Sequence, residues 1–369
     1  MNISFWEQRH LFEQVDFCIT GGGIVGLHTA LFLRDKYPTA KILVLEKALI
    51  GAAASSKNAG FACFGSVSEI LDDIATIGTD AAFELIRMRW DGLQLLQKTH
   101  GKQALGLQVN GGWELFTAAD RETFEQCMQL IPELNRGLDY IGPETYNINQ
   151  KDTYQFNGIT NTIFNRYEGQ VNTDLMYYNL ELKALKSGIR MIRGIQVTGF
   201  SDNASGVSVA LGDFSFNCRK LLITNNGFAA TLLASANVEP ARAQVLVTEP
   251  IPGFTLNGTY HYDKGYYYFR NCGDRLLIGG GRNTDFDAEN TSEQQITDNI
   301  QQKIEELMYA VILKEKVKIE YRWAGTMGIG KTKFPIIEEI SPNVSCGVRM
   351  GGMGVAIGAL VAEKLVSFN

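Results

Sequence analysis

The chain has 369 residues, of which 45% are hydrophobic and 20% charged, and it carries a net charge of −6 with a pI near 5.4. This length predicts about two domains, each with its own core. The sequence contains no Lys/Arg cluster, which disfavours nucleic-acid binding. The longest apolar stretch, residues 355–362, is too short to span a bilayer, and the N-terminus lacks an apolar signal core. We therefore expect a cytoplasmic protein without an integral membrane segment.

The first predicted unit spans residues 15–47. A β-branched and aromatic run is followed by the glycine pattern Gly21-x-Gly23-x-x-Gly26, an apolar helical stretch and a second strand that ends on Glu46. This order is typical of a dinucleotide-binding unit. Gly21 permits a tight turn, Gly23 lets backbone N–H groups approach a pyrophosphate, and Gly26 lets the helix pack closely on the sheet.

The start of the predicted helix, at Ile24 and Val25, offers N–H donors and the positive end of the helix dipole to a phosphate. Glu46 lies about twenty residues beyond the last glycine, where a carboxylate can accept both ribose hydroxyl hydrogens and would repel a 2′-phosphate. The unit therefore predicts a dinucleotide without a 2′-phosphate. Both FAD and NAD meet this condition.

Beyond this unit, helical and strand patterns alternate, and no linker separates them. Residues 51–66 are small and polar and predict a loop pressed against another part of the molecule. Helices are expected over residues 69–100, 119–137, 173–186, 291–312 and 355–366. Strands are expected over residues 108–116, 158–164, 318–323 and 335–340, and as meanders over residues 190–225 and 243–281. Without a linker, the chain is predicted to cross between its two domains several times.

Cysteine and histidine spacing gives no sign of a disulfide framework or a metal site. Six cysteines are scattered without a Cys-x-x-Cys pair, which is typical of reduced thiols in a cytoplasm. The four histidines lie far apart in the sequence, so we expect no bound metal.

Taken in order along nearly the whole chain, several motifs together resemble the D-amino-acid-oxidase-type family of FAD-dependent amine oxidoreductases, which contains glycine oxidase, sarcosine oxidase and D-amino-acid dehydrogenase. The first is the N-terminal glycine pattern with Glu46. The others are Ser55-Ser56-Lys57-Asn58-Ala59-Gly60, Glu168-Gly169-Gln170-Val171-Asn172, Leu222-Ile223-Thr224-Asn225-Asn226-Gly227, Arg322-Trp323-Ala324-Gly325 and Gly351-Gly352-Met353-Gly354-Val355. The N-terminal and C-terminal motifs are specific as a pair.

The C-terminal glycine turn is the main reason to prefer FAD to NAD. A glycine-rich turn at a helix start gathers N–H donors and the positive dipole end at one point. The resemblance implies that this point faces the flavin N1–C2=O edge; the alternative is a glycine turn before a docking helix. The cofactor contacts that the resemblance implies, beyond the first unit, come from Lys47, Ser55, Ser56, Lys57, Asn58, Ala59, Gly60, Val197, Asn225, Gly227, Gly351, Gly352, Met353, Gly354 and Val355.

Two departures from the family pattern affect the cofactor. Relatives that attach flavin covalently use a Cys or a His in stretches that here contain neither, so non-covalent FAD is expected. Met353 stands where sarcosine-oxidase-like members often have His. Lys57 would run beside the flavin, where it could tune the ring, bind pyrophosphate or remain solvated.

On the substrate side, the resemblance implies that Arg322 binds a substrate carboxylate, because Arg offers a bidentate fork. A structural salt bridge is the alternative. Tyr266 matches a substrate-contacting tyrosine by position, and strand alternation would place Tyr266 and Tyr268 on one face. An ordinary packed aromatic is the alternative for Tyr266. Arg349 could bind an acidic substrate group or cap a strand.

We therefore expect an α/β fold in which a Rossmann-type FAD domain is interleaved with a mixed-sheet α+β substrate domain. The FAD domain is expected from residues 1–95, 165–240 and 325–369, and the substrate domain from residues 96–164 and 241–324.

The expected reaction is oxidation of an amino acid or secondary amine by hydride transfer to flavin N5, which gives an imine that hydrolyses. Oxygen or a quinone or other electron-transfer partner would reoxidise the flavin. One alternative is a 2-hydroxy-acid or polyol dehydrogenase on the same fold, which needs a base and would be favoured by His261 at the flavin face. The others are an NAD-dependent dehydrogenase and a flavin-containing binding protein without turnover.

Overall fold

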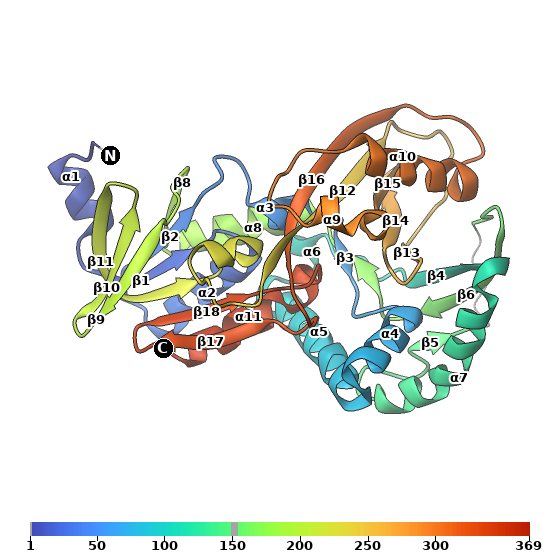
Figure 1. Ribbon diagram of the computed structural model, residues 1–369, viewed down its shortest axis with the longest axis horizontal. Helices are drawn as coiled ribbons and strands as arrows, with labels where there is room; N and C mark the ends of the chain where they lie inside the picture. The colour runs from blue at the N-terminus through green and yellow to red at the C-terminus, as the bar shows by residue number, and fades with distance from the viewer. Residues whose placement is uncertain (1, 149–153) are drawn as a thin grey trace.

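The computed structural model describes residues 2–148 and 154–369, in which distant parts of the chain assemble into two eight-stranded sheets. Figure 1 shows sheet 1 on the left and sheet 2 on the right. In spatial order, sheet 1 contains β17 (Ile336–Ser341), β18 (Val344–Val348), β11 (Phe214–Ile223), β1 (Val15–Thr20), β2 (Ile42–Glu46) and β8 (Arg190–Arg193), with β10 (Gly206–Leu211) and β9 (Gly199–Asn203) branching from β11. Sheet 2 contains β16 (Ile319–Ile329), β12 (Glu239–Thr248), β15 (Arg275–Gly280), β14 (Tyr267–Cys272), β13 (Thr259–Tyr262), β4 (Gly112–Thr117), β6 (Ile159–Asn165) and β5 (Tyr146–Asn147).

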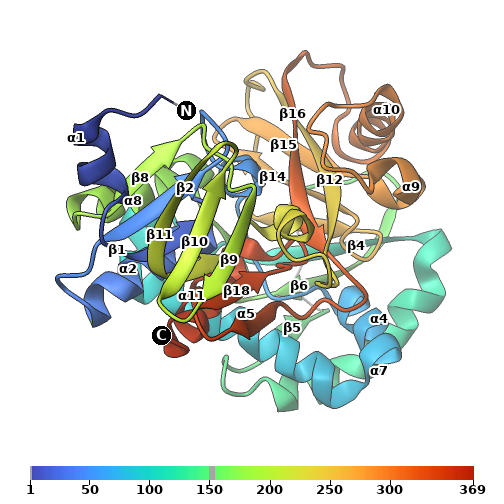
Figure 2. The same ribbon diagram turned by 60° about the vertical axis from the view of Figure 1, so that its left-hand side comes forward.

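Sheet 1 has a parallel centre, because β18, β11, β1, β2 and β8 pair in parallel. Every residue of β2 and β18 is buried, as expected for parallel strands covered on both faces. The helices α2 (Ile24–Lys36) and α11 (Gly354–Ser367) begin after β1 and β18, at the same carboxyl edge. In both views α11 lies beside α5 (Thr79–His100), and it also packs against α2 (Figure 1, Figure 2).

The predicted helix over residues 69–100 is in fact two helices. These are α4 (Val67–Ile77) and α5, and Gly78 separates them with φ +85°. A residue with a side chain rarely adopts this conformation, so the glycine ends one helix and turns the chain into the next. Helix α8 (Thr173–Lys186) has the predicted bounds, and α7 (Arg121–Gly137) follows a 3-10 turn at residues 118–120.

The predicted helix over residues 291–312 begins later than expected. Thr291 Oγ1 accepts the Glu293 N–H at 3.2 Å and closes a local turn, so α10 starts only at Asp298 and runs to Leu307, before a π-helical turn to Ile312. The strand expected over residues 318–323 extends to Ile329, because β16 pairs with β12 along its whole length. The remaining short elements are α1 (Phe5–Glu7), α3 (Ala53–Lys57), α6 (Lys102–Leu105), α9 (Phe286–Glu289) and the pair β3 (Phe61–Ala62) and β7 (Gly169–Gln170).

The α/β class with one mixed second sheet is confirmed. Among the described residues, no helix combines the length and apolar character that crossing a bilayer requires.

Candidate active site

The N-terminal glycines are required by close backbone approaches. A Cβ on Gly26 would lie 1.8 Å from the Gly21 carbonyl oxygen, and Gly21 itself has φ +108° beside Thr224. Helix α2 begins at Ile24 without a capping side chain at Gly23. The Ile24 N–H donates to Ser55 Oγ, so the N–H groups of Val25 and Gly26 are the ones that an anion at the carboxyl edge of sheet 1 could use.

The Glu46 side chain is fixed beside the N-terminus of α2. The side chain is 7% exposed, its Oε2 accepts the Gly22 N–H at 2.7 Å, and its Oε1 accepts the Ala48 N–H at 2.8 Å. Each oxygen keeps a lone pair that a ribose hydroxyl can use. Lys47 lies beside Glu46 and holds its Nζ 5.5 Å from the ring centre of Phe228.

Val197 lies in the segment that borders the Glu46 strand, since the Ile195 N–H donates to the Glu46 backbone oxygen. Val197 is buried. The chain between β8 and β9 therefore supplies a buried apolar side chain next to the strand that ends on Glu46.

The loop of residues 55–60 connects the start of α2 to sheet 2. Ser55 Oγ accepts the Ile24 N–H at 2.9 Å, and Ser56 Oγ accepts the Ala52 N–H at 3.0 Å. Asn58 folds the loop by donating to the Ser55 carbonyl at 2.7 Å and accepting the Gly60 N–H at 2.9 Å.

The far end of the same loop is held by sheet 2. The Ala59 carbonyl accepts a bond of 2.5 Å from Arg270 Nε, and the Gly60 carbonyl accepts the Val171 N–H at 2.8 Å. A Cβ on Gly60 would lie 2.4 Å from the Val171 oxygen, and its φ is +76°. The loop is thus clamped between both sheets.

The C-terminal glycine turn meets the end of β11. Gly351 and Gly352 have φ +57° and +83°, and α11 then starts without a capping side chain at Met353. The Met350 N–H donates to Asn226 Oδ1 at 3.0 Å, and a Cβ on Gly227 would lie 2.3 Å from the Met327 oxygen. The neighbouring Asn225 Oδ1 is buried and has no partner in the described part of the chain.

The two helix starts therefore converge. Ile24 at the start of α2 and Val355 at the start of α11 belong to one hydrophobic cluster, and a Cβ on Gly358 would lie 2.8 Å from Ile24. Two helix N-termini, an oriented carboxylate and a clamped small-residue loop fit a long dinucleotide with a pyrophosphate and a second electron-rich end.

One face of sheet 2 looks toward this loop. Directly paired residues in neighbouring strands point to the same face. The register aligns Trp323, Val245, Gly279, Tyr268, His261 and Glu114 in one row across β16, β12, β15, β14, β13 and β4. The Phe61 ring lies 5.3 Å from the His261 ring and 5.6 Å from the Tyr268 ring. The Trp323 Nε1–H donates to the Lys57 carbonyl at 2.9 Å.

The structure places Arg322 on the opposite face of sheet 2. Arg322 precedes Trp323, so its side chain points toward α10, where it forms an ion pair of 2.8 Å with Glu305 and donates to Gln301 at 2.7 Å. Arg322 therefore forms a structural salt bridge, which was the alternative to binding a substrate carboxylate.

Tyr266 also lies away from the row that faces the loop. Strand β14 begins only at Tyr267, so the expected alternation does not include Tyr266. Its ring is 5.8 Å from the Phe286 ring and packs with the cluster beneath α10. Tyr268, two residues further, is the tyrosine on the loop-facing side.

The other cations near the site are already engaged. Arg349 donates to the carbonyls of Phe334 and Asn237, each at 2.8 Å. Lys333 pairs with Glu69 and Asp73. Lys57 donates to the neutral Gln294 Oε1 at 2.5 Å, and burial lowers its pKa.

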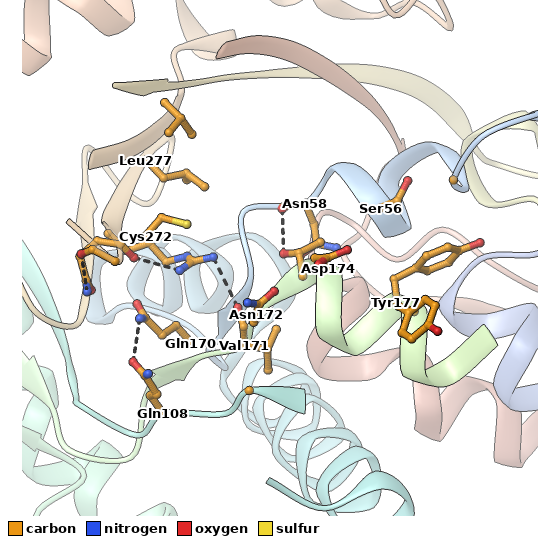
Figure 3. A pocket seen from close by; sticks show the side chains of 18 of the residues that line it. Ser56, Asn58, Gln108, Gln170, Val171, Asn172, Asp174, Tyr177, Cys272 and Leu277 are labelled. Carbon is orange, nitrogen blue, oxygen red and sulfur yellow. Dashed lines mark hydrogen bonds between the residues drawn. The ribbon is translucent and has the colours of Figure 1, made fainter. Parts of the chain in front are cut away.

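A cavity of about 610 Å³ adjoins the outer side of the loop (Figure 3). Ser56, Asn58, Gln170 and Trp323 line it, but none of the fingerprint glycines does. Arg270 also lines it and donates to three carbonyls, with no carboxylate partner among the described residues. The cavity therefore borders the predicted dinucleotide path at Ser56 and Asn58 without reaching the fingerprint glycines.

Two histidines that are distant in the sequence meet in the fold. His28 donates from Nδ1 to the Ile24 carbonyl at 2.7 Å, and its Nε2 lies 2.9 Å from His100 Nε2. Burial lowers the pKa of His28 to about 4 and that of His100 to about 3. Both rings are therefore neutral near pH 7, and one accepts the proton that the other donates.

A second group of potential metal ligands also forms. Cys63, Glu168 and His261 each place one ligand atom within 4.8 Å of the other two. A bond of 2.5 Å between His261 Nε2 and Glu168 Oε1 uses the nitrogen that a metal would need, and burial raises the pKa of the Cys63 thiol. We interpret this group as a hydrogen-bonded His–Glu pair beside a neutral thiol. The group could not be predicted from the sequence, because its three residues are far apart along the chain.

Comparison with known proteins identifies the family. Residues 16–367 match the DAO family, described as FAD dependent oxidoreductase. Probable oxidoreductase OrdL from Haemophilus influenzae is 22% identical over 373 residues, which cover 96% of this chain and 83% of that protein. Sarcosine oxidase subunit beta from Rhizobium meliloti is 24% identical over 350 residues, which cover 90% of this chain and 79% of that protein. Glycine oxidase from Bacillus cereus superposes with a TM-score of 0.77 at 16% identity, covering 96% of this chain and 97% of that structure.

The chain belongs to the DAO family of FAD-dependent oxidoreductases. It is therefore an oxidoreductase whose cofactor is FAD, and non-covalent binding of FAD is typical of the family. The resemblance inferred from the motifs is confirmed, and FAD is the correct choice over NAD.

Proposed function

We propose that this protein oxidises an amine or an amino acid at the carbon next to nitrogen, and that water hydrolyses the resulting imine. The observation that carries the proposal is that the convergent helix starts at sheet 1 face the aromatic row of sheet 2. FAD, when bound, supplies the hydride acceptor. The protein has to hold the reacting carbon in place and keep water away from it.

Sheet 2 provides side chains suited to that task. Tyr268 is partly buried, and this burial raises its pKa to about 12, so its hydroxyl stays protonated and can donate a hydrogen bond. The Trp323 ring is oriented by its bond to the Lys57 carbonyl, and Phe61 closes the space beside His261. We propose Tyr268 and Trp323, in place of Tyr266 and Arg322, as the substrate wall.

The charges around the candidate site favour an amine without a carboxylate over an α-amino acid. Arg322 and Lys333 are paired with carboxylates, and Arg349 is bonded to backbone carbonyls. Lys57 is bonded only to a neutral amide, so we propose it as the cation that a substrate carboxylate would have to use.

The cofactor contacts and the domain boundaries are also proposals. All strands of sheet 1 fall within residues 1–95, 165–240 and 325–369, which supports that division. Strand β16 runs across residue 325 and β12 across residue 240, so two continuous strands would join the domains.

A second candidate function is oxidation of a 2-hydroxy acid or polyol. A hydroxyl has to lose its proton when the carbon is oxidised, and this requires a base. The position of His261 in the loop-facing row, next to Tyr268, supports this alternative.

Anaerobic mixing of the purified holoprotein with secondary amines, D- and L-amino acids and hydroxy acids tests both functions. We expect loss of the flavin band at about 450 nm, a property of the cofactor, with amines first. Bleaching by hydroxy acids alone would support the second candidate, and bleaching by none of the compounds would contradict both. The reduced enzyme can then be mixed with oxygen or with a quinone to identify the acceptor.

A further inference from the structure

We propose that His261, oriented by Glu168, accepts the proton that the substrate loses from the heteroatom next to the carbon being oxidised. This inference rests on the proposed function and adds a base to it. Family membership does not require the pair; it follows from the geometry around β13.

Glu168 is held rigidly in the interior. The side chain is 1% exposed, and its Oε1 accepts the Thr259 Oγ1–H at 2.8 Å. A Cβ on Gly112 would lie 2.4 Å from the Glu168 carboxyl carbon, so the glycine makes room for the carboxylate. A buried carboxylate held in this way needs a cationic or donor partner.

His261 is that partner. Its Nε2 lies 2.5 Å from Glu168 Oε1, which assigns the Nε2 hydrogen to this bond. When the ring is neutral, Nδ1 therefore carries the lone pair. Nδ1 has no hydrogen-bond partner anywhere in the described part of the chain, so it is free to take a proton.

The ring also lies on the face that a substrate would meet. His261 pairs in register with Tyr268, and its ring touches Phe61, which follows the clamped loop. It is 6% exposed, so water access is restricted and a nearby group acts strongly.

The charges around His261 favour its protonated form. Glu168, Glu114 and Glu69 face it from three elements, and together they raise its pKa although burial alone would lower it. Glu114 is bonded to Ser68, and Glu69 is paired with Arg89 and Lys333. The thiol of Cys63 and the hydroxyl of Tyr268 are further ionisable neighbours, and burial raises the pKa of both, so they stay neutral.

The step balances as follows. The N–H bond of the substrate ammonium breaks, its electron pair stays on nitrogen, and the proton moves to His261 Nδ1. From this neutral amine, FAD when bound would supply the acceptor for the hydride that leaves the carbon as the C=N bond forms. For a hydroxyl substrate the same nitrogen would take the O–H proton as C=O forms.

The test measures pH profiles in the FAD-loaded protein. The rate of anaerobic flavin reduction, and the Kd of a tertiary-alkyl amine that has no hydrogen on the carbon next to nitrogen, should share one titrating limb. In His261→Gln that limb should vanish from both profiles, and reduction should slow by about 10²-fold.

Glu168→Gln separates a proton acceptor from a merely structural histidine. This change keeps a hydrogen-bonding side chain but removes the charge that raises the His261 pKa, so the limb should move to lower pH. Thr259→Val, which removes one donor to Glu168, gives a second and milder perturbation. His10→Gln, at an exposed histidine, is the matched control and should leave both profiles unchanged.

An unchanged limb in both His261→Gln and Glu168→Gln would overturn the inference while leaving amine oxidation intact. Failure of every substrate to bleach the wild-type flavin would instead overturn the proposed function. The binding profile of the unreactive amine does not depend on turnover, so it distinguishes the two failures.

Discussion

The two ends of the candidate site are built in different ways. At sheet 1, the groups that would meet the cofactor are mostly backbone N–H groups and glycines, placed by consecutive residues such as Gly21 to Gly26. At sheet 2, the groups that would meet the substrate are side chains from six strands, aligned only by register. A short motif therefore describes the first end fully, while the second depends on pairings that no local motif contains.

The largest expected effect tests the backbone character of the cofactor end. In Gly26→Ala the new Cβ would lie 1.8 Å from the Gly21 oxygen, so α2 has to move away from the turn. We expect at least about a tenfold loss of bound FAD, measured as flavin absorbance per protein. Gly199→Ala is the control, because nothing lies within 4 Å of its Cβ position. Full flavin content in Gly26→Ala would show that the close approach is not needed.

The register of the strands decides which side chains of sheet 2 face the loop, and a local sequence motif does not contain this information. The fingerprint and the clamped loop were predictable because each residue's task follows from its neighbours in the chain. Arg322 and Trp323 differ by one position, and that one position decides between α10 and the loop-facing side of sheet 2.

Tyr266 shows a second limit of sequence patterns. The expectation that it shares a face with Tyr268 was wrong, because the strand starts one residue after Tyr266, and no pattern in the aromatic run marks that start. The His261–Glu168 pair was beyond reach, because it joins residues 93 positions apart. The fold class could be predicted without knowing the register, because the order of strands and helices along the chain determines it.

The next expected effect tests the register of the substrate end. Tyr268→Phe removes a hydroxyl from the loop-facing row, whereas Tyr266→Phe removes one from the opposite cluster. We expect Tyr268→Phe to lower kcat/KM for the best amine by about tenfold, as loss of one hydrogen bond at the reacting group does. Tyr266→Phe should leave it within about twofold. A reversed order of the two effects would restore Tyr266 as the substrate contact.

The histidines sharpen the comparison through pH. His28 lies on the cofactor helix and has no carboxylate beside it within residues 2–148 and 154–369, so burial dominates and its pKa falls to about 4, whereas the pKa of His261 is raised. Because the pKa of His28 is lower in the folded state than in the unfolded state, His28 contributes fully to the free energy of unfolding above pH 6.5. This contribution is lost as the pH falls toward 4, where the buried ring also becomes protonated. For His28 the loss reaches about 3 kcal/mol.

Chemical unfolding at pH 7 and pH 4.5 measures this loss. We expect His28→Gln to lose less stability between the two pH values than the wild type, because the titrating group is gone. The exposed His10→Gln variant should follow the wild type. An equal loss in His28→Gln would assign the acid sensitivity to other groups.

The smallest expected effect concerns Arg322. Its ion pair with Glu305 is about one-third exposed on both sides, and such pairs contribute less than about 1 kcal/mol. Arg322→Ala should therefore lower the free energy of unfolding slightly and leave KM for every accepted substrate within about twofold. Glu305→Gln is the matched variant, since it breaks the same pair from α10 and should give a similar small loss. A tenfold or larger rise in KM for Arg322→Ala alone would mean that the arginine leaves Glu305 to bind a substrate carboxylate. The register of β16 would then not decide which side chain reaches the substrate.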